Sequence, residues 1–313
     1  MTASAPSGPF GRDTPIGFIG LGVMGGGMAT CLLRRGHRLH VHARRAEVAQ
    51  RFAQMGAQAA ATPAALGRAA PLVFLCLPDG PALEQVLFEP DGLAAGLAAG
   101  SVVVDTSTIA AGEARAIGAR LAAQGASYLD APVSGGQQGA DAGTLACMVG
   151  GPEAAVAACR EVMAAFCKSV THVGATGAGQ AVKACNQVAV AGALLGVADA
   201  IALAKTEGVD LAVMREVLLA GTARSFSLEK HAPRIIDGDF VPGFRAALMR
   251  KDLGLALQAA QDAGAQLQAA ALAAQLLDDA CAAGRAGWDW TALALEVQKR
   301  SGMDVPASPG AGG

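Results

Sequence analysis

Three polar side chains share one face of a predicted helix that is otherwise mostly apolar and covers residues 180–207. Lys183, Asn186 and Gln187 stand at i, i+3 and i+4, a spacing that places them side by side on that face. A lysine can exchange a proton with a ligand, and the two amides can hold that ligand by hydrogen bonds. Burying these groups among apolar residues costs free energy unless they have a function there. The alternative is a lysine whose ammonium reaches solvent.

A second candidate site is Ser134-Gly135-Gly136, which follows a short strand-like run and a Pro-Val step. Two glycines after a serine leave backbone N–H groups free to cradle a carboxylate, and the serine hydroxyl adds a further donor. From this segment alone, an ordinary glycine loop is an equal alternative.

A glycine pattern near the start of the chain predicts a dinucleotide site. The sequence Gly20-Leu21-Gly22-Val23-Met24-Gly25 is G-x-G-x-x-G, placed between an apolar run and a helix-like stretch. In that context the first glycine makes a tight turn, the second admits the pyrophosphate, and the third permits close helix–strand packing. The helix start then offers unpaired N–H groups to the phosphates.

The end of the second predicted strand indicates which dinucleotide binds. NAD-binding units usually place Asp or Glu there to hold the ribose 2′-hydroxyl. This chain has Ala43, Arg44 and Arg45 there, and its first carboxylate is Glu47. An arginine fork can pair with a 2′-phosphate, which a carboxylate would repel. Arg44 and Arg45 therefore favour NADP(H) over NAD(H), unless they only decorate a solvated turn.

Other polar residues are assigned structural roles. We expect Asp130 and Asp252 to cap helices or pair with lysines, Asp105 to end a strand, and residues 288–290 to form a packing corner. The seven cysteines are scattered without a Cys-x-x-Cys pair, so we expect most of them to be small buried hydrophobic residues. Neither they nor the histidines show the spacing of a metal site.

The elements that must position these residues follow two patterns. Up to about residue 176, short apolar runs alternate with helix-like stretches, which predicts βαβ units and a parallel sheet covered on both faces. The expected strands are 15–19, 38–42, 72–77, 102–105, 127–129, 144–149 and 169–173. A helix is expected after the glycine turn up to about residue 35, and further helices at 46–55, 81–88, 111–124 and 152–166. Beyond residue 179 only helices are expected, at 180–207, 211–219, 225–237, 251–264, 267–283 and 290–299.

These patterns predict two domains, as the length of 313 residues also suggests. An α/β Rossmann-type domain with a parallel-rich sheet is expected over residues 14–176, followed by an all-α domain over 177–301. Flexible tails are expected at 1–13 and 302–313.

Composition limits the function classes. With 52% hydrophobic and 16% charged residues, the chain is too apolar to be disordered. Its 24 basic and 26 acidic residues provide no excess of positive charge for nucleic acid. The uncharged stretch 14–33 could span a membrane by length, but its six glycines favour a turn, and the first 13 residues do not look like a signal peptide. We expect a cytoplasmic protein without nucleic-acid or membrane partners.

Four blocks of sequence stand in one order that is typical of a known family. They are Phe18-Ile-Gly20-Leu-Gly22-Val-Met24-Gly25, Asp130-Ala-Pro132-Val-Ser134-Gly135-Gly136, Gly177-Ala-Gly179-Gln-Ala-Val-Lys183-Ala-Cys-Asn186-Gln187 and Lys251-Asp252-Leu253. Together they resemble the β-hydroxyacid dehydrogenase family, which includes 3-hydroxyisobutyrate dehydrogenase and tartronate semialdehyde reductase. The resemblance extends over residues 15–302.

The resemblance implies roles for individual residues. Lys183 would be the catalytic acid/base, and Ser134-Gly135-Gly136 would receive the substrate carboxylate with Asn186 and Gln187 nearby. Leu77-Pro78 and Thr108 would line the cofactor, and Lys251 would reach its nicotinamide end from the helical domain.

The chain differs from the family pattern at two positions that bear on the choice of cofactor and substrate. Ala43 stands where some family members carry an Asp, which counts against a preference for NAD. Gln187 stands where many members have a second Asn, and in this the chain is similar to tartronate semialdehyde reductases.

The expected function is NADP(H)-dependent interconversion of a small β-hydroxy acid and its semialdehyde, with 2-hydroxy-3-oxopropionate as the first substrate. A 3-hydroxyisobutyrate-type substrate is the nearest alternative. Imine reductases of similar architecture usually lack the lysine, so Lys183 counts against imine reduction. A nucleotide-sensing scaffold is the non-enzyme alternative. The apolar second domain predicts a homodimer or homotetramer joined through its helices.

Overall fold

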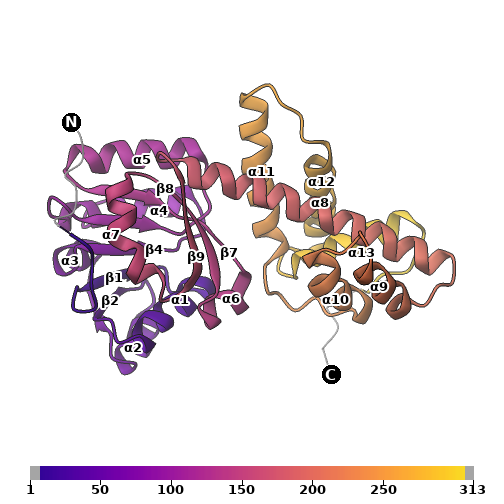
Figure 1. The fold of residues 1–313 in the computed structure, drawn as a ribbon, viewed down its shortest axis with the longest axis horizontal. Coiled ribbons are helices and arrows are strands. Elements are labelled where there is room, and N and C mark those ends of the chain that lie inside the picture. Colours follow the sequence, from indigo (N-terminus) through magenta and orange to yellow (C-terminus); the bar gives the residue numbers. More distant parts are fainter. Residues whose placement is uncertain (1–7, 307–313) are drawn as a thin grey trace. The chain divides into compact units, whose positions relative to one another are not determined.

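The computed structural model describes residues 8–306 of the chain, which divides into two compact units, Met1–Lys183 and Ala184–Gly313 (Figure 1). Helix α8 (Ala178–Thr206) begins in the first unit and continues into the second. The domain boundary predicted from the sequence, between residues 176 and 177, lies just before this helix.

The first unit is built on a nine-stranded sheet with the order β3-β2-β1-β4-β5-β6-β8-β7, and β9 pairs with β8. The strands from β1 to β6 pair in parallel, whereas β8 is antiparallel to β6 and β7 and parallel to β9. The strands are β1 (Ile16–Ile19), β2 (Leu39–His42), β3 (Gln58–Ala59), β4 (Leu72–Leu75), β5 (Val102–Asp105), β6 (Ser127–Asp130), β7 (Val133–Ser134), β8 (Leu145–Gly150) and β9 (Cys167–Gly174).

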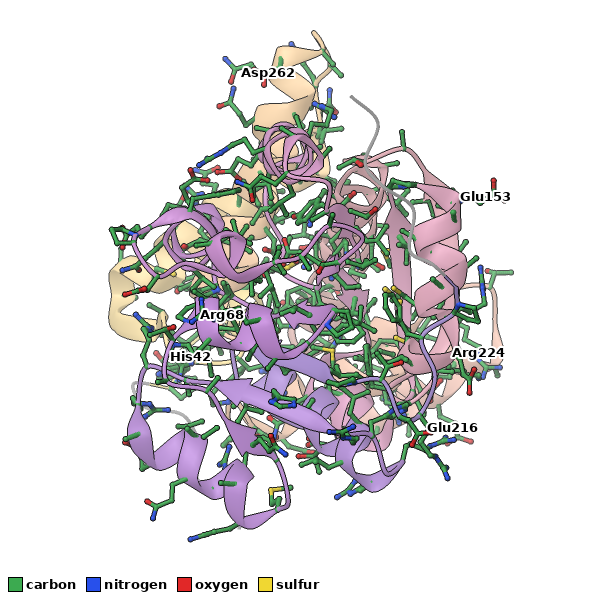
Figure 2. The ribbon with its side chains drawn as sticks, turned by 90° about the vertical axis from the view of Figure 1, so that its left-hand side faces the viewer. His42, Arg68, Glu153, Glu216, Arg224 and Asp262 are labelled. Carbon is green, nitrogen blue, oxygen red and sulfur yellow. The ribbon has the colours of Figure 1, made fainter. Side chains whose placement is uncertain are left out.

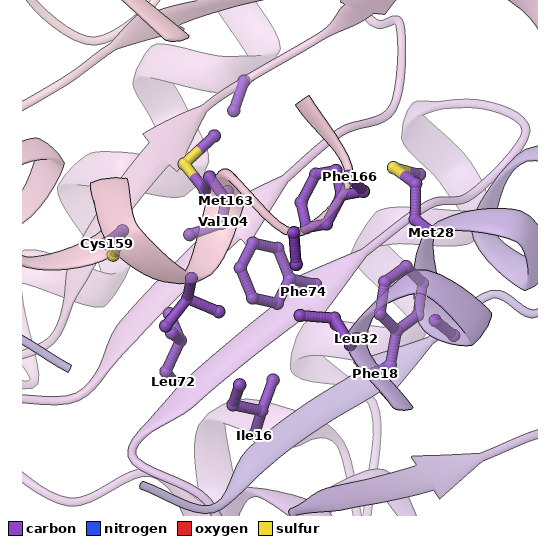
Figure 3. Close-up of a cluster of buried hydrophobic side chains, with 14 of the residues drawn as sticks. Ile16, Phe18, Met28, Leu32, Leu72, Phe74, Val104, Cys159, Met163 and Phe166 are labelled. Carbon is purple, nitrogen blue, oxygen red and sulfur yellow. The ribbon is translucent and has the colours of Figure 1, made fainter. Parts of the chain in front are cut away.

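The central strands β1, β4, β5 and β6 are buried along their whole length. Because successive side chains of a strand point to opposite faces, both faces of the sheet are covered there. In β4, Phe74 belongs to one hydrophobic cluster and Val73 to a second one. In the first cluster the Phe74 ring stacks near Phe18, with centroids 6.0 Å apart, and meets Phe166 edge-on at 5.4 Å (Figure 3). Near-continuous apolar strands are therefore what this sheet requires.

Helices cover the two faces separately. Side chains from α1 (Val23–Arg34), α2 (Ala46–Gln54) and α7 (Glu153–Met163) pack in the first cluster. Side chains from α3 (Pro63–Ala69), α4 (Gly80–Phe88) and α5 (Ala111–Ala123) pack in the second. The remaining elements of the unit are the 3-10 turn η1 (Leu93–Gly96) and α6 (Gly136–Ala142). The sequence predictions missed α3, α6, β3 and β7, which are too short to show a period.

The strand order reverses between β1 and β4, since β2 and β3 lie on one side of this pair and β5 and β6 on the other. In doubly wound sheets, ligands bind at the carboxyl ends of the strands at such a reversal. The G-x-G-x-x-G turn follows β1, and Leu77-Pro78 follows β4, so both segments lie at this position.

The second unit is helical and has its own core (Figure 1). Besides the rest of α8 it contains α9 (Leu211–Ala220), the π-helical turn η2 (Ser227–His231), α10 (Ala232–Asp237), α11 (Ala246–Asp262), α12 (Gln268–Ala280), the π-helical turn η3 (Cys281–Arg285), the 3-10 turn η4 (Trp290–Ala292) and α13 (Leu293–Arg300). In the described part of this unit the single β-type pairing is the isolated bridge between Arg245 and Asp289.

Helix α11 begins five residues before its predicted start at Lys251. Its first N–H groups bind residues that are distant in the sequence. Ala246 donates to the Trp288 carbonyl over 2.8 Å and Ala247 to the Ala286 carbonyl over 3.1 Å. These contacts stabilise a helix start that has no local signal in the sequence.

The predicted flexible tails are wrong where the structure describes them in contact with the cores. Phe10 is buried, and its N–H donates to the Ala158 carbonyl over 2.9 Å. Met303 and Val305 pack against hydrophobic clusters of the second unit. Burial of these apolar side chains away from water stabilises the folded state. Residues 1–7 and 307–313 of the predicted tails lie outside the described residues.

Within residues 8–306, α8 is the one helix that is long and apolar enough to cross a membrane by length and composition. Half of its most apolar window is buried inside the protein, and core helices pass the same test. The uncharged stretch 14–33 forms β1, the glycine turn and most of α1 instead of a single helix.

Candidate active site

The glycine turn after β1 has the backbone geometry of a dinucleotide site. Gly20 has φ +96°, and a Cβ on it would overlap the Cys76 carbonyl oxygen. A Cβ on Gly25 would overlap the Gly20 carbonyl oxygen, so the third glycine lets α1 approach the strand closely. A Cβ on Gly22 would meet open space, and no side-chain hydrogen bond caps α1 among the described residues. The space and the free N–H groups fit a pyrophosphate.

Arginines replace a carboxylate at the carboxyl end of β2. His42 ends the strand (Figure 2), and its Nδ1 lies 3.1 Å from the Ala60 carbonyl. Arg44 and Arg45 follow on the surface, and Arg45 lines a cleft of about 750 Å³ that also includes Gly22. The Arg45–Glu47 ion pair is 3.6 Å long and highly exposed, so it holds the guanidinium weakly.

The loops after β4 and β5 are joined by hydrogen bonds. The Leu77 N–H donates to the Ser107 hydroxyl over 2.8 Å, and the Ser107 N–H donates to Asp105 over 2.9 Å. Thr108 lies in the second loop, next to Ser107. The predicted cofactor contacts Leu77-Pro78 and Thr108 are therefore carried by two segments that hold each other in place.

Lys183 lies against the Ser134-Gly135-Gly136 segment. Its side chain is 7% exposed, and Nζ donates to the Val133 carbonyl over 2.9 Å. Gly135 and Gly136 have φ values of +136° and +61°, which favour glycine, and they lead directly into α6 instead of a longer loop. The structure thus places the predicted proton donor beside the segment predicted to hold a carboxylate.

Asp130 fixes the start of α8, as its predicted capping role requires. One carboxylate oxygen accepts from the Gly177 N–H over 2.7 Å and the other from the Gln180 N–H over 2.9 Å. Burial raises the pKa of Asp130, and these hydrogen bonds oppose that rise.

A second buried carboxylate, Asp105, ends β5 as predicted and pairs in register with Asp130 at the end of β6. The Tyr128 hydroxyl donates to Asp105 over 2.7 Å. Burial raises the pKa of Asp105 to about 6, in spite of hydrogen bonds from Ser107 and Tyr128. Tyr128 was not singled out from the sequence, although the single tyrosine of the chain in an apolar strand needs a partner for its hydroxyl.

The polar residues of the second unit form a side-chain network. Gln187 is 5% exposed, and its Nε2 donates to Asp252 over 2.7 Å. Asn186 Nδ2 donates to Gln187 Oε1 over 2.8 Å, and Lys251 Nζ lies 3.1 Å from the other Asp252 oxygen. Asp252 is thus a lysine partner, as expected. Gln187 supports Asp252 in this structure, so its predicted direct contact with a substrate stays a prediction.

Asp289 forms the expected packing corner. It accepts hydrogen bonds from the N–H groups of Gly243, Phe244 and Thr291, and its carboxylate lies 3.0 Å from the guanidinium of Arg234.

The cysteines are as predicted in most respects. Four cysteines are buried and two are half-buried, but Cys185 is exposed. Among residues 8–306 there is no group of three or more His, Cys, Asp or Glu that could hold a metal ion.

Two family models cover most of the chain. The NAD-binding domain of 6-phosphogluconate dehydrogenase matches residues 15–174. The NAD-binding domain of NADP-dependent 3-hydroxyisobutyrate dehydrogenase matches residues 177–297.

Individual proteins agree with these matches. The 2-hydroxy-3-oxopropionate reductase of Escherichia coli is 39% identical over 284 residues, which are 90% of this chain and 97% of the relative. The 3-hydroxyisobutyrate dehydrogenase of Pseudomonas aeruginosa is 38% identical over 270 residues, or 84% and 91% of the two chains.

Solved structures share the fold. The 3-hydroxyisobutyrate dehydrogenase of Mycobacterium tuberculosis with L-serine has a TM-score of 0.84 at 32% identity, covering 91% of this chain and 99% of that one. Psf3 in complex with NADP+ and 2-OPP has a TM-score of 0.83 at 33% identity, covering 90% and 99%. The chain therefore belongs to the β-hydroxyacid dehydrogenase family and is an NAD(P)-dependent oxidoreductase.

Proposed function

We propose that this chain is an NADPH-dependent reductase of small semialdehyde carboxylates, with 2-hydroxy-3-oxopropionate as its preferred substrate. The observation that carries the proposal is the position of Lys183, whose buried ammonium is bound to the carbonyl of Val133, one residue before Ser134-Gly135-Gly136. A proton donor and a cradle for a carboxylate then adjoin each other.

Different residues of the chain donate the proton and bind the substrate in this reaction. Bound NADPH supplies the hydride that reduces the aldehyde carbon. Lys183 donates a proton from Nζ to the oxygen on which negative charge develops, a contribution of about 10²–10⁴ in rate for a positioned acid. The Ser134 hydroxyl and the N–H groups of Gly135 and Gly136 bind the substrate carboxylate.

The preference for NADPH is supported by the end of β2. Arg44 and Arg45 are exposed there, and Arg45 lines the cleft that includes Gly22. The strand carries no carboxylate that would repel a 2′-phosphate. Glu47 is the first acid after the strand, and its weak pairing with Arg45 leaves that arginine able to bind a phosphate.

The choice of substrate is supported by sequence. The Asn186-Gln187 pair is similar to that of tartronate semialdehyde reductases, and the Escherichia coli relative carries the name of that activity. The 3-hydroxyisobutyrate-type substrate remains the second candidate, because a relative of that name is 38% identical.

The test is a panel of short semialdehydes and hydroxy acids, assayed with NADPH and with NADH through the absorbance of the cofactor. We expect the highest kcat/KM for 2-hydroxy-3-oxopropionate with NADPH. A higher value for the semialdehyde of 3-hydroxyisobutyrate would move the assignment to the second candidate. Turnover of any of them excludes a scaffold without activity, and turnover of none contradicts the proposal.

We also propose that the protein is a homodimer or homotetramer joined through the second unit. None of the ten α9 residues, all of them described, is buried, and Val213 and Val217 are 57% and 65% exposed on one face. Large apolar side chains exposed one helical turn apart favour an interaction surface. Light scattering at micromolar concentration is expected to give a multiple of the 31.1 kDa chain mass, and a monomer would contradict this assembly.

A further inference from the structure

The side-chain amide of Gln180, in the first turn of α8, forms two hydrogen bonds with the main chain of another segment. The side chain is 2% exposed; Nε2 donates to the Ser107 carbonyl over 2.8 Å, and Oε1 accepts from the Ile109 N–H over 3.2 Å. It therefore binds the backbone on both sides of Thr108, much as a neighbouring strand would. A neutral amide suits this task, because it offers a donor and an acceptor at one end of a side chain.

The backbone of Gln180 is itself held firmly. Its N–H and that of Gly177 donate to the two oxygens of Asp130, which is buried at the end of β6. Asp130 thus fixes the start of α8 on the sheet, and the Gln180 side chain then fixes the loop after β5 on α8.

The loop that Gln180 holds carries the predicted cofactor contacts. It includes Thr108, and the Ser107 hydroxyl accepts the N–H of Leu77. One helical turn further on, Lys183 reaches the Val133 carbonyl. Residues i and i+3 are neighbours on a helix surface, so the residue that binds the loop at Thr108 adjoins the proton donor on α8.

We propose that Gln180 is a positioning residue, which sets the distance between the loop at Thr108 and the ammonium of Lys183. It touches neither reactant and acts through the backbone of Ser107 and Ile109. This role rests on the proposed function, in which Lys183 is the proton donor and Thr108 lines the cofactor.

Two substitutions at Gln180 separate positioning from simple packing. Gln180→Leu keeps the size of the side chain and removes both hydrogen bonds. Gln180→Glu keeps the shape, but its ionised carboxylate cannot donate to the Ser107 carbonyl, whereas its protonated form has one donor and one acceptor like the amide. Activity of Gln180→Glu should therefore recover as the pH is lowered, and that of Gln180→Leu should not.

Gln298→Leu is the matched control. Gln298 is a buried amide in α13 and accepts a hydrogen bond from Lys205 over 2.9 Å, within the second unit. Its replacement removes a buried amide without changing the cofactor loop, so it should lower the melting temperature and leave kcat unchanged.

The experiment measures kcat, KM for the best semialdehyde, NADPH affinity by fluorescence and melting temperature for the wild type and the three variants. Because small misplacements of reacting groups cost up to about a hundredfold in rate, we expect kcat of Gln180→Leu to fall by about ten- to a hundredfold. Its NADPH affinity should fall several-fold, and KM for the carboxylate should stay near the wild-type value.

Several results would overturn the role of Gln180. These are a kcat of folded Gln180→Leu within about twofold of wild type, an equal loss in Gln298→Leu, or a Gln180→Glu profile parallel to that of wild type. If Gln180→Leu does not fold, the pH profile of Gln180→Glu decides. If no semialdehyde is turned over, the proposed function fails by itself, and unchanged NADPH affinity in Gln180→Leu then refutes the link to the cofactor loop as well.

Discussion

The two units build their functional groups in different ways. In the first unit the main chain provides several of them, through the turn at Gly20, the cradle at Gly135-Gly136 and the Val133 carbonyl that holds Lys183. In the second unit they come from a side-chain network in which Gln187 reaches across 65 residues of sequence to Asp252. Sites built from the main chain can be predicted locally, because they require glycines at fixed spacing. Side-chain networks cannot be predicted in this way, because they depend on which helices pack together.

The largest effect on cofactor binding is expected from adding a single methyl group to the main-chain turn of the first unit. Gly25→Ala places a Cβ on the Gly20 carbonyl oxygen, which must then move out of the turn. We expect NADPH affinity to fall by roughly a hundredfold or more, or about 3 kcal/mol. Fluorescence titration measures the loss.

The neighbouring glycine provides a matched control. A Cβ on Gly26 would lie 3.5 Å from its nearest neighbour, the Leu21 carbonyl oxygen, which is an ordinary contact. Gly26→Ala should bind NADPH like the wild type. If both alanine variants bind alike, the close approach at Gly25 is not needed for the site.

The buried carboxyl group of Asp105 predicts the next largest effect, on stability. Because its pKa is raised from 3.8 to about 6, the folded state binds more protons than the unfolded state between about pH 4 and pH 6. Stability should therefore fall as the pH rises through this window, by about 3 kcal/mol in total. Asp105→Asn should lack this contribution, so the difference in the free energy of unfolding between wild type and variant should shift in favour of the variant from pH 4.5 to pH 7.5, as urea unfolding can measure.

Asp239 in the second unit is the control with the opposite sign. Its pKa is lowered, first of all by a hydrogen bond from Arg234, so its contribution to stability is present at neutral pH and lost in acid. The stability difference between wild type and Asp239→Asn should shrink as the pH falls. If Asp105→Asn shows the same trend as Asp239→Asn, the buried Asp105 carboxyl does not carry the raised pKa.

The smallest effect concerns cofactor choice. A charge-assisted pair is worth about 1.5–3 kcal/mol, so replacing Arg44 and Arg45 with Ala should weaken NADPH binding by roughly ten- to a hundredfold and change NADH binding little. Arg68→Ala, an exposed arginine on α3, should change neither (Figure 2). Equal weakening of both cofactors in the double variant would mean that the arginines do not bind a 2′-phosphate.

The difference between the units also explains what the sequence could predict. The apolar run of β5 gave its bounds, Val102–Asp105, to the residue, and the G-x-G-x-x-G spacing located the turn. Gln180 was missed because a glutamine in the first turn of a helix has no local signature, and its partners, Ser107 and Ile109, lie about 70 residues earlier. The early start of α11 was missed for the same reason.

The central claim is that Lys183 supplies the proton while other residues hold the cofactor and the carboxylate. Its most direct test measures NADPH affinity and semialdehyde turnover together in Lys183→Ala, with Ser134→Ala for comparison. We predict that Lys183→Ala binds NADPH nearly as well as the wild type while kcat falls by about 10²–10⁴. Ser134→Ala should instead raise KM with a smaller effect on kcat. Near-normal turnover in Lys183→Ala, or loss of its NADPH binding, would contradict the assignment.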